Sequence, residues 1–206
     1  MKKISITCLL ALAPVLAAAN IIPTLTVIGG TSPVTWTYNL QLSGDQDVAA
    51  GLAPSENPVP HTNLLFGSFL TIYDFAGYVA GTCTGPTGWG CTAQNIGFTP
   101  DDVLPVENPT VTNLTWVYTS GPLITGQPNG FDLGFFSAQS IYGESTLVSY
   151  AARGIKNDGL AAGTISDNVG DTRGPRALEV PEPSSLLLAG LALSLMAWSR
   201  PSKASR

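Results

Sequence analysis

The run from Val34 to Leu42 alternates apolar and polar side chains without a break. Valine, tryptophan, tyrosine and leucine fall on one parity, and threonine, asparagine and glutamine fall on the other. Successive side chains of a β-strand point to opposite faces of the sheet, so this pattern predicts a strand with one buried face and one face in water. No window in the middle of the chain shows a long apolar stripe at the helical period. The run therefore constrains this part of the chain to a half-buried sheet.

Further runs of β-branched and aromatic residues support an all-β fold. Residues 114–119 repeat the alternation, and runs bounded by Gly, Pro or Asn lie at 24–28, 69–75, 131–136 and 146–151. Strands separated by turn-rich loops are typical of a sandwich or barrel-like architecture. Because the alternation leaves one face in water, it favours antiparallel over parallel pairing. We predict an antiparallel β-sandwich with a jelly-roll-like arrangement.

The N-terminus has the three parts of a secretory signal peptide. Lys2 and Lys3 supply positive charge, residues 4–16 are apolar, and Ala17–Ala19 supply small residues for cleavage before Asn20. The sequence thus predicts a signal helix at 1–19 and export through the Sec translocon. Cys8 lies inside the apolar region and is not preceded by a lipobox, so a lipoprotein is not predicted.

The C-terminal segment 180–206 has an ordered three-part composition. Pro181, Glu182 and Pro183 precede an apolar stretch without charges at 184–199, and a basic tail at 200–206 contains Arg200, Lys203 and Arg206. Residues that are apolar on every helical face are buried in lipid or in a core. Sixteen residues span roughly 24 Å, which is short of the roughly 30 Å hydrocarbon layer. We predict one marginal transmembrane helix with a cytoplasmic C-terminus; a buried terminal helix of the domain is the alternative.

This order of parts resembles the PEP-CTERM sorting signal of Gram-negative bacteria, a segment also known as the ice-binding protein C-terminal domain. The basic cluster departs from the pattern because Pro201 follows Arg200. The L-P-x-T-G of sortase substrates is absent, and a glycolipid-anchor signal would end on its apolar stretch. The resemblance implies processing near Pro181–Pro183 by an exosortase, transient residence in the inner membrane, and delivery to the cell surface or matrix. Such systems accompany exopolysaccharide and biofilm genes. Residues 68–77, together with the cysteine loop that follows and residues 113–116, are also similar to ectodomains of other PEP-CTERM proteins of unassigned function.

Between the two termini we expect one domain at 20–169 and a spacer at 170–179. Residues 20–179 carry four basic and thirteen acidic side chains, a net charge of −9. Such a surface repels phosphates, so nucleic acid is excluded as a partner. The loop at 43–63 is rich in proline and small residues, and we expect it to be an exposed connection. The loop at 99–110 is acidic and contains three prolines.

Cys83 and Cys91 are the two cysteines that remain after removal of the signal peptide. In an oxidising compartment they are expected to form a disulfide around the short segment that contains Trp89. An aromatic ring held in such a loop can stack on a sugar, or it can cover the edge of the core. The sequence leaves both roles open for Trp89.

The residues that metal or acid–base chemistry needs are present, but their spacing fits no known site. Asp45 and Asp47 lack a third oxygen ligand at the calcium-loop position. The segment Asp167–Asp171 fails the same test, and both stretches are interpreted as solvated turns. Asp101 and Asp102 are interpreted as a charge pair in a loop. We predict no metal site and no cofactor.

Nucleophilic catalysis lacks its parts. His61 is the only histidine, there is no G-x-S-x-G, and both mature cysteines are expected to be paired. His61 is therefore interpreted as a surface residue, and no catalytic residue is predicted. A two-carboxylate glycosidase stays open in principle, because any two of the acidic residues can meet in the fold.

The leading hypothesis is a non-enzymatic surface or matrix protein, with a carbohydrate-binding or carbohydrate-active sandwich as the alternative. The strand pattern places Trp36 and Trp116 in the core, which leaves Trp89 for a ligand. Ice binding ranks third, because Thr24-x-Thr26 and Thr35-x-Thr37 are too short for a regular ladder of threonines.

Overall fold

The computed structural model describes residues 21–177. The predicted signal peptide (1–19) and sorting segment (180–206) lie outside the described residues, and so do their predicted helices. Within residues 21–177, no helix has the length and hydropathy needed to cross a bilayer. The described chain is all-β, as the alternating pattern predicted. Its helical content is one 3₁₀ turn, η1, at Gly159–Ala161.

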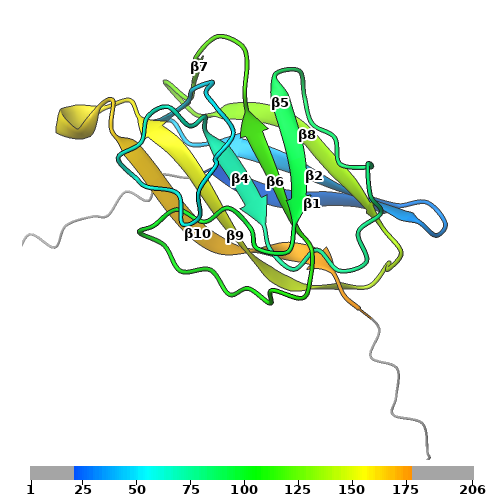
Figure 1. Ribbon diagram of the computed structural model, residues 1–206. Helices are drawn as coiled ribbons and strands as arrows, with labels where there is room; N and C mark the ends of the chain where they lie inside the picture. The colour runs from blue at the N-terminus through cyan, green and yellow to red at the C-terminus, as the bar shows by residue number, and fades with distance from the viewer. Residues whose placement is uncertain (1–20, 178–206) are drawn as a thin grey trace, which may run out of the picture. The chain divides into compact units, whose positions relative to one another are not determined.

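Ten strands form two antiparallel sheets (Figure 1). Sheet A has the order β1-β2-β8, and sheet B has the order β5-β6-β4-β9-β3-β7, with β10 paired to β9. The strand bounds are β1 Ile21–Gly29, β2 Val34–Leu42, β3 Gln46–Val48, β4 Phe69–Ile72, β5 Trp89–Gln94, β6 Asn113–Tyr118, β7 Ile124–Thr125, β8 Phe131–Ser140, β9 Ser145–Lys156 and β10 Ile165–Pro175.

The main core lies between the two sheets, and β1 and β2 pass behind β4 and β6 in Figure 1. Sheet A contributes the inward side chains of β2, and sheet B contributes Leu70, Leu114 and Trp116. Trp36 is fully buried, and its indole N–H donates to the carbonyl of Tyr142 at 3.1 Å. The predicted core positions of Trp36 and Trp116 are therefore confirmed.

The topology differs from a jelly roll. A jelly roll distributes eight strands over two sheets through two Greek keys. Here three strands pair in sheet A and seven in sheet B. The hairpins β1–β2, β5–β6 and β9–β10 each stay within one sheet. The prediction of two antiparallel sheets is correct, and the jelly-roll comparison is not.

The centre of sheet B, at β4 and β6, is buried on both faces, which the sequence pattern did not predict. All six residues of β6 are buried, including Asn113 and Thr115. The outer face of these strands is covered by the loops at 50–68 and 95–110, and Val59 packs with Phe69 of β4 and Val117 of β6 in a second small core. The Thr71 hydroxyl donates to the carbonyl of Phe98 at 2.7 Å. The loop expected to be an exposed connection thus packs on the sheet through Val59, which is fully buried.

The predicted spacer is also shorter than expected. β10 pairs with β9 along its whole length, from Ile165 opposite Ile155 to Pro175 opposite Ser145. Residues 170–175 therefore belong to the sheet. Thr172 is buried, and its hydroxyl donates to the carbonyl of Pro23 in β1 at 3.0 Å. The prediction failed because the glycines and aspartates of this segment look like a linker, whereas its strand pairing depends on a long partner strand.

Candidate functional site

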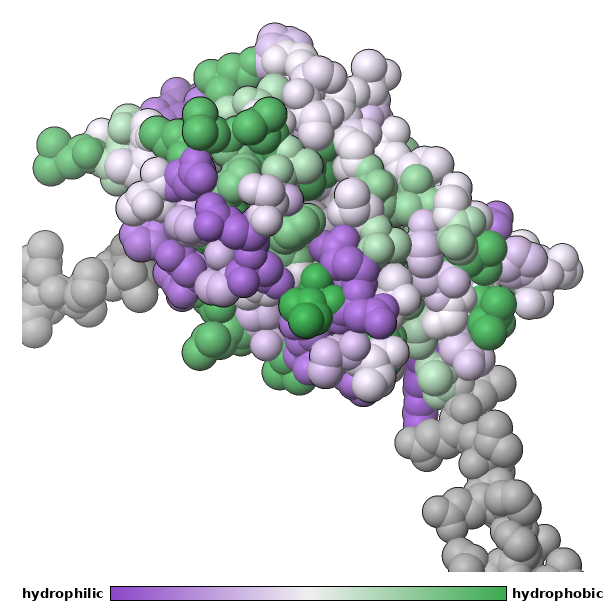
Figure 2. All heavy atoms as spheres, viewed as in Figure 1, coloured by the Kyte–Doolittle hydropathy of each residue, from purple (hydrophilic) through white to green (hydrophobic). Residues whose placement is uncertain are grey.

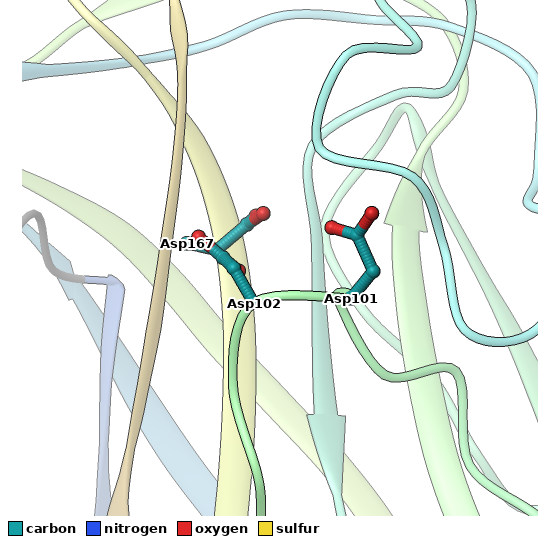
Figure 3. Close-up of side chains that lie close together, drawn as sticks. All are labelled: Asp101, Asp102 and Asp167. Carbon is teal, nitrogen blue, oxygen red and sulfur yellow. The ribbon is translucent and has the colours of Figure 1, made fainter.

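Three aspartates from distant parts of the chain meet at one end of sheet B (Figure 3). Asp101 and Asp102 lie on the loop that follows β5, and Asp167 lies on β10. One carboxylate oxygen from each residue lies within 4.8 Å of the others. Asp101 and Asp102 are exposed, whereas the side chain of Asp167 is 0% exposed. The interpretation of Asp167 as a solvated turn residue is therefore wrong.

Arg153 on β9 pairs with Asp167 directly across the β9–β10 ladder. Its Nε donates to Asp167 Oδ1 at 2.9 Å, and its Nη2 donates to Oδ2 at 3.1 Å. The guanidinium also donates to the carbonyls of Val59 and Pro60, each at 3.0 Å, and lies 5.4 Å from the ring centroid of Phe69. A planar guanidinium with five N–H donors can bond to acceptors on β10 and on the 50–68 loop at the same time. Arg153 thus fastens the 50–68 loop to sheet B.

The environment of Asp167 opposes its ionisation. Burial raises the pKa of its carboxyl group to about 6, although the hydrogen bonds and charge of Arg153 act in the other direction. The nearby carboxyl group of Asp102 adds a further upward contribution. Two carboxylates in contact favour a shared proton because both cannot be ionised without repulsion. The carboxyl group of Asp167 is therefore poised to change its charge in mildly acidic solution.

Asp101 is occupied by His61. Its Oδ1 accepts hydrogen bonds from the backbone N–H of His61 and from its ring Nδ1, both at 2.9 Å. Desolvation raises the pKa of Asp101, but the hydrogen bonds from His61 outweigh it, so the pKa of this carboxyl group lies below its ordinary value. The side chain of His61 is 56% exposed. The prediction that His61 is a surface residue is confirmed.

An open pocket of about 310 Å³ lies beside His61. Its lining residues come from the 60–64 loop and the β9–β10 turn, namely His61, Thr62, Leu64, Gly163, Thr164 and Ile165. The polar side chains in this lining are the imidazole of His61 and the hydroxyls of Thr62 and Thr164, and Thr164 Oγ1 donates to the carbonyl of Ala161 at 2.7 Å. The pocket offers space for a small ligand beside His61.

A cation bound at the three aspartates would compete with groups that already contact them. Arg153 takes both oxygens of Asp167, and His61 takes one oxygen of Asp101. The other acidic stretch is also occupied, because Asp45 forms an ion pair with Lys156. No spacing signal in the sequence could have found the cluster, since it depends on the β9–β10 register and on the path of the 95–110 loop.

The predicted disulfide is confirmed. Cys83 and Cys91 are joined, with their Cα atoms 6.0 Å apart. The loop that the disulfide closes lies next to sheet A, because the backbone N–H of Thr84 donates to the carbonyl of Ser137 in β8 at 2.8 Å. The disulfide therefore links the start of β5 in sheet B to a segment that extends sheet A.

Trp89 takes the core-covering role. It is half-buried, and its ring lies 5.0 Å from that of Phe136 in an edge-to-face arrangement and 5.4 Å from that of Tyr118. Aromatic pairs at these separations contribute to packing. The ring thus closes the edge of the core between the two sheets, and stacking on a ligand stays a prediction.

The comparisons with known proteins bear on the C-terminal segment. Residues 179–200 match the model of the PEP-CTERM protein-sorting motif, and this range contains Pro181, Glu182, Pro183 and Arg200. No curated protein matches the chain. The chain is thus an all-β domain joined to a sorting segment, the organisation of a protein that is exported and then sorted. The chain thus carries a PEP-CTERM sorting segment, a motif whose processing partner is an exosortase.

Proposed function

We propose that this protein is a non-enzymatic component of the bacterial cell surface or extracellular matrix, associated with exopolysaccharide and biofilm. The observation that carries the proposal is the sorting motif at 179–200. In this scheme the Sec translocon exports the chain and the apolar stretch 184–199 holds it in the inner membrane. The basic tail, with Arg200, Lys203 and Arg206, stays on the cytoplasmic side, as positive charge favours. An exosortase then acts near Pro181–Pro183 and releases the domain to the surface.

The marginal length of the apolar stretch supports a transient membrane stage. A helix of sixteen residues is about 6 Å shorter than the hydrocarbon layer, so it anchors less well than a full span. Proline removes a backbone donor and fits only the first turn of a helix, so the Pro181–Pro183 motif would sit at the start of the span. That position offers the motif to a membrane-embedded enzyme.

Replacement of Pro181, Glu182 and Pro183 together by alanine tests the proposal. We expect the variant to accumulate in the inner membrane in an unprocessed form, which cell fractionation and a mass shift on gels would detect. Pro201→Ala, outside the matched range, is the matched control and should be processed like the wild type. Normal surface delivery of the triple variant would refute sorting through this motif.

A further inference from the structure

The outer face of sheet A differs in charge from the domain as a whole. Residues 20–179 carry a net charge of −9. Within β1, β2 and β8, however, the one charged residue is Asp132. The outward side chains of these strands are hydroxyls, amides and a few apolar groups. This face therefore carries one charge, that of Asp132, and is otherwise a neutral hydrogen-bonding surface on an acidic domain.

The strand registers arrange these side chains in rows. Residues paired across an antiparallel ladder point to the same face, so each row crosses all three strands of sheet A. Four rows follow from the β1–β2 and β2–β8 registers: Ile22–Gln41–Asp132, Thr24–Asn39–Phe135, Val27–Thr37–Ser137 and Gly29–Thr35–Gln139. Neighbouring strands lie about 4.8 Å apart, which is close to the length of one pyranose unit in an extended glycan.

Hydrogen bonds within the face fix the amide side chains. Asn39 Nδ2 donates to Asp132 Oδ1 at 2.8 Å, and Gln41 Nε2 donates to Asn39 Oδ1. Gln139 Nε2 donates to the hydroxyl of Thr35 at 3.3 Å. Each amide keeps further donor or acceptor capacity after these bonds are made. Because these side chains are already ordered by hydrogen bonds, binding of a ligand costs less side-chain conformational entropy.

One aromatic ring stands on this face. Phe135 is 62% exposed and lies in the same row as Thr24 and Asn39. A large apolar ring surrounded by polar groups matches the two kinds of surface on a sugar, which has an apolar ring face and a rim of hydroxyls. In sheet B the outer face of β4 and β6 is covered by the loops at 50–68 and 95–110. Figure 2 shows the side of the molecule turned toward the viewer, where hydrophilic and hydrophobic residues are interspersed.

We propose that the outer face of sheet A binds an uncharged polysaccharide, with Phe135 stacked on a sugar ring and Asn39, Gln41 and Gln139 bonded to its hydroxyls. This inference rests on the proposed function for the delivery of the domain to the matrix. A polyanion finds no cation among the three strands, and a polycation finds only Asp132, which already accepts from Asn39. Among matrix polymers, an uncharged glycan therefore matches the low charge of this face.

The test is affinity electrophoresis of the full chain, solubilised in a mild detergent, in gels that contain a defined polymer. Hydroxyethylcellulose, dextran and galactomannan are the neutral probes, and alginate is the anionic comparator. We expect at least one neutral polymer to slow the wild-type protein and alginate not to do so. Loss of one aromatic stacking contact lowers affinity roughly tenfold, which is the shift expected for Phe135→Ala.

Leu104→Ala is the matched control, because Leu104 is 93% exposed and lies on the 95–110 loop. Its retardation should equal that of the wild type. Gln41→Arg is the second variant, since Gln41 is exposed and a cation there would obstruct the face without a core change; we expect it to reduce retardation. Far-UV circular dichroism verifies the fold of all three variants.

Several results would overturn the proposal. They are an unretarded wild type in every neutral gel, equal retardation of Phe135→Ala, or retardation by alginate alone. Thermal hysteresis that is lost in Phe135→Ala, without retention by any polymer, would assign the face to ice binding instead.

The sorting test is independent of these readouts. Failure of the Pro181–Pro183 variant to block delivery would leave polymer binding unaffected, and an unretarded wild type would leave sorting unaffected.

Discussion

Removal of the Arg153 guanidinium should destabilise the domain strongly, because that group is buried and hydrogen-bonded through each of its nitrogens. Arg153→Met keeps much of the side-chain stem but removes every guanidinium hydrogen bond. Asp167, with a 0% exposed side chain, would then hold a buried carboxylate without its ion-pair partner. The carbonyls of Val59 and Pro60 would also lose their donor. Breaking one side of a buried ion pair typically costs about 3–5 kcal/mol. We expect a loss of this size in the free energy of unfolding.

The same geometry predicts that removal of both charges costs less than removal of one. In the double variant Arg153→Met/Asp167→Leu no buried charge is left unpaired, and such replacements are often close to neutral. The expected coupling between the two sites is therefore at least about 2 kcal/mol, measured by a double-mutant cycle. Urea unfolding of a fragment comprising residues 20–177, followed by tryptophan fluorescence, supplies the four free energies.

The control for this cycle is Arg173→Met. Arg173 is exposed, and its Nη1 lies 3.4 Å from the hydroxyl of Ser145. A surface substitution of this kind should change the unfolding free energy by less than about 0.5 kcal/mol. A cost below about 1 kcal/mol for Arg153→Met, or additive costs in the double variant, would refute the reasoning that the buried Arg153–Asp167 ion pair stabilises the domain.

Three further predictions concern the rest of the domain. Because the pKa of Asp167 is raised from 3.8 to about 6 in the fold, its favourable contribution is complete below pH 4. That contribution is lost as the pH rises through 6, with a fall of about 3 kcal/mol. Urea midpoints between pH 4 and 7 should show this fall in the wild type but not in Asp167→Asn. Replacement of both Cys83 and Cys91 by serine should cost about 2.5 kcal/mol, because the disulfide closes a short loop, and an unchanged melting temperature would contradict this. Tyr38→Phe should leave stability unchanged or raise it by about 1 kcal/mol, since the buried hydroxyl of Tyr38 has no hydrogen-bond partner; a clear loss in calorimetry would argue against it.

Local pattern alone determined the class of fold. The alternation at Val34–Leu42 fixed which side chains of β2 face the core, because strand geometry imposes a period of two on any half-buried strand. Trp36 and Trp116 were placed correctly for this reason. The disulfide followed from the number of mature cysteines and their expected compartment. The sorting segment was also readable, since its order of parts is contiguous in the chain.

Tertiary structure alone decided what lies at a distance in the sequence. Whether β6 has one buried face or two depends on where the loops at 50–68 and 95–110 pack, and no periodicity encodes that. The approach of Asp102 to Asp167 requires the β9–β10 register and the path of a loop. The rows on sheet A likewise arise only when three strands pair, which turns scattered threonines and amides into one surface. Local pattern thus set which way each strand faces, and long-range pairing set which residues became neighbours.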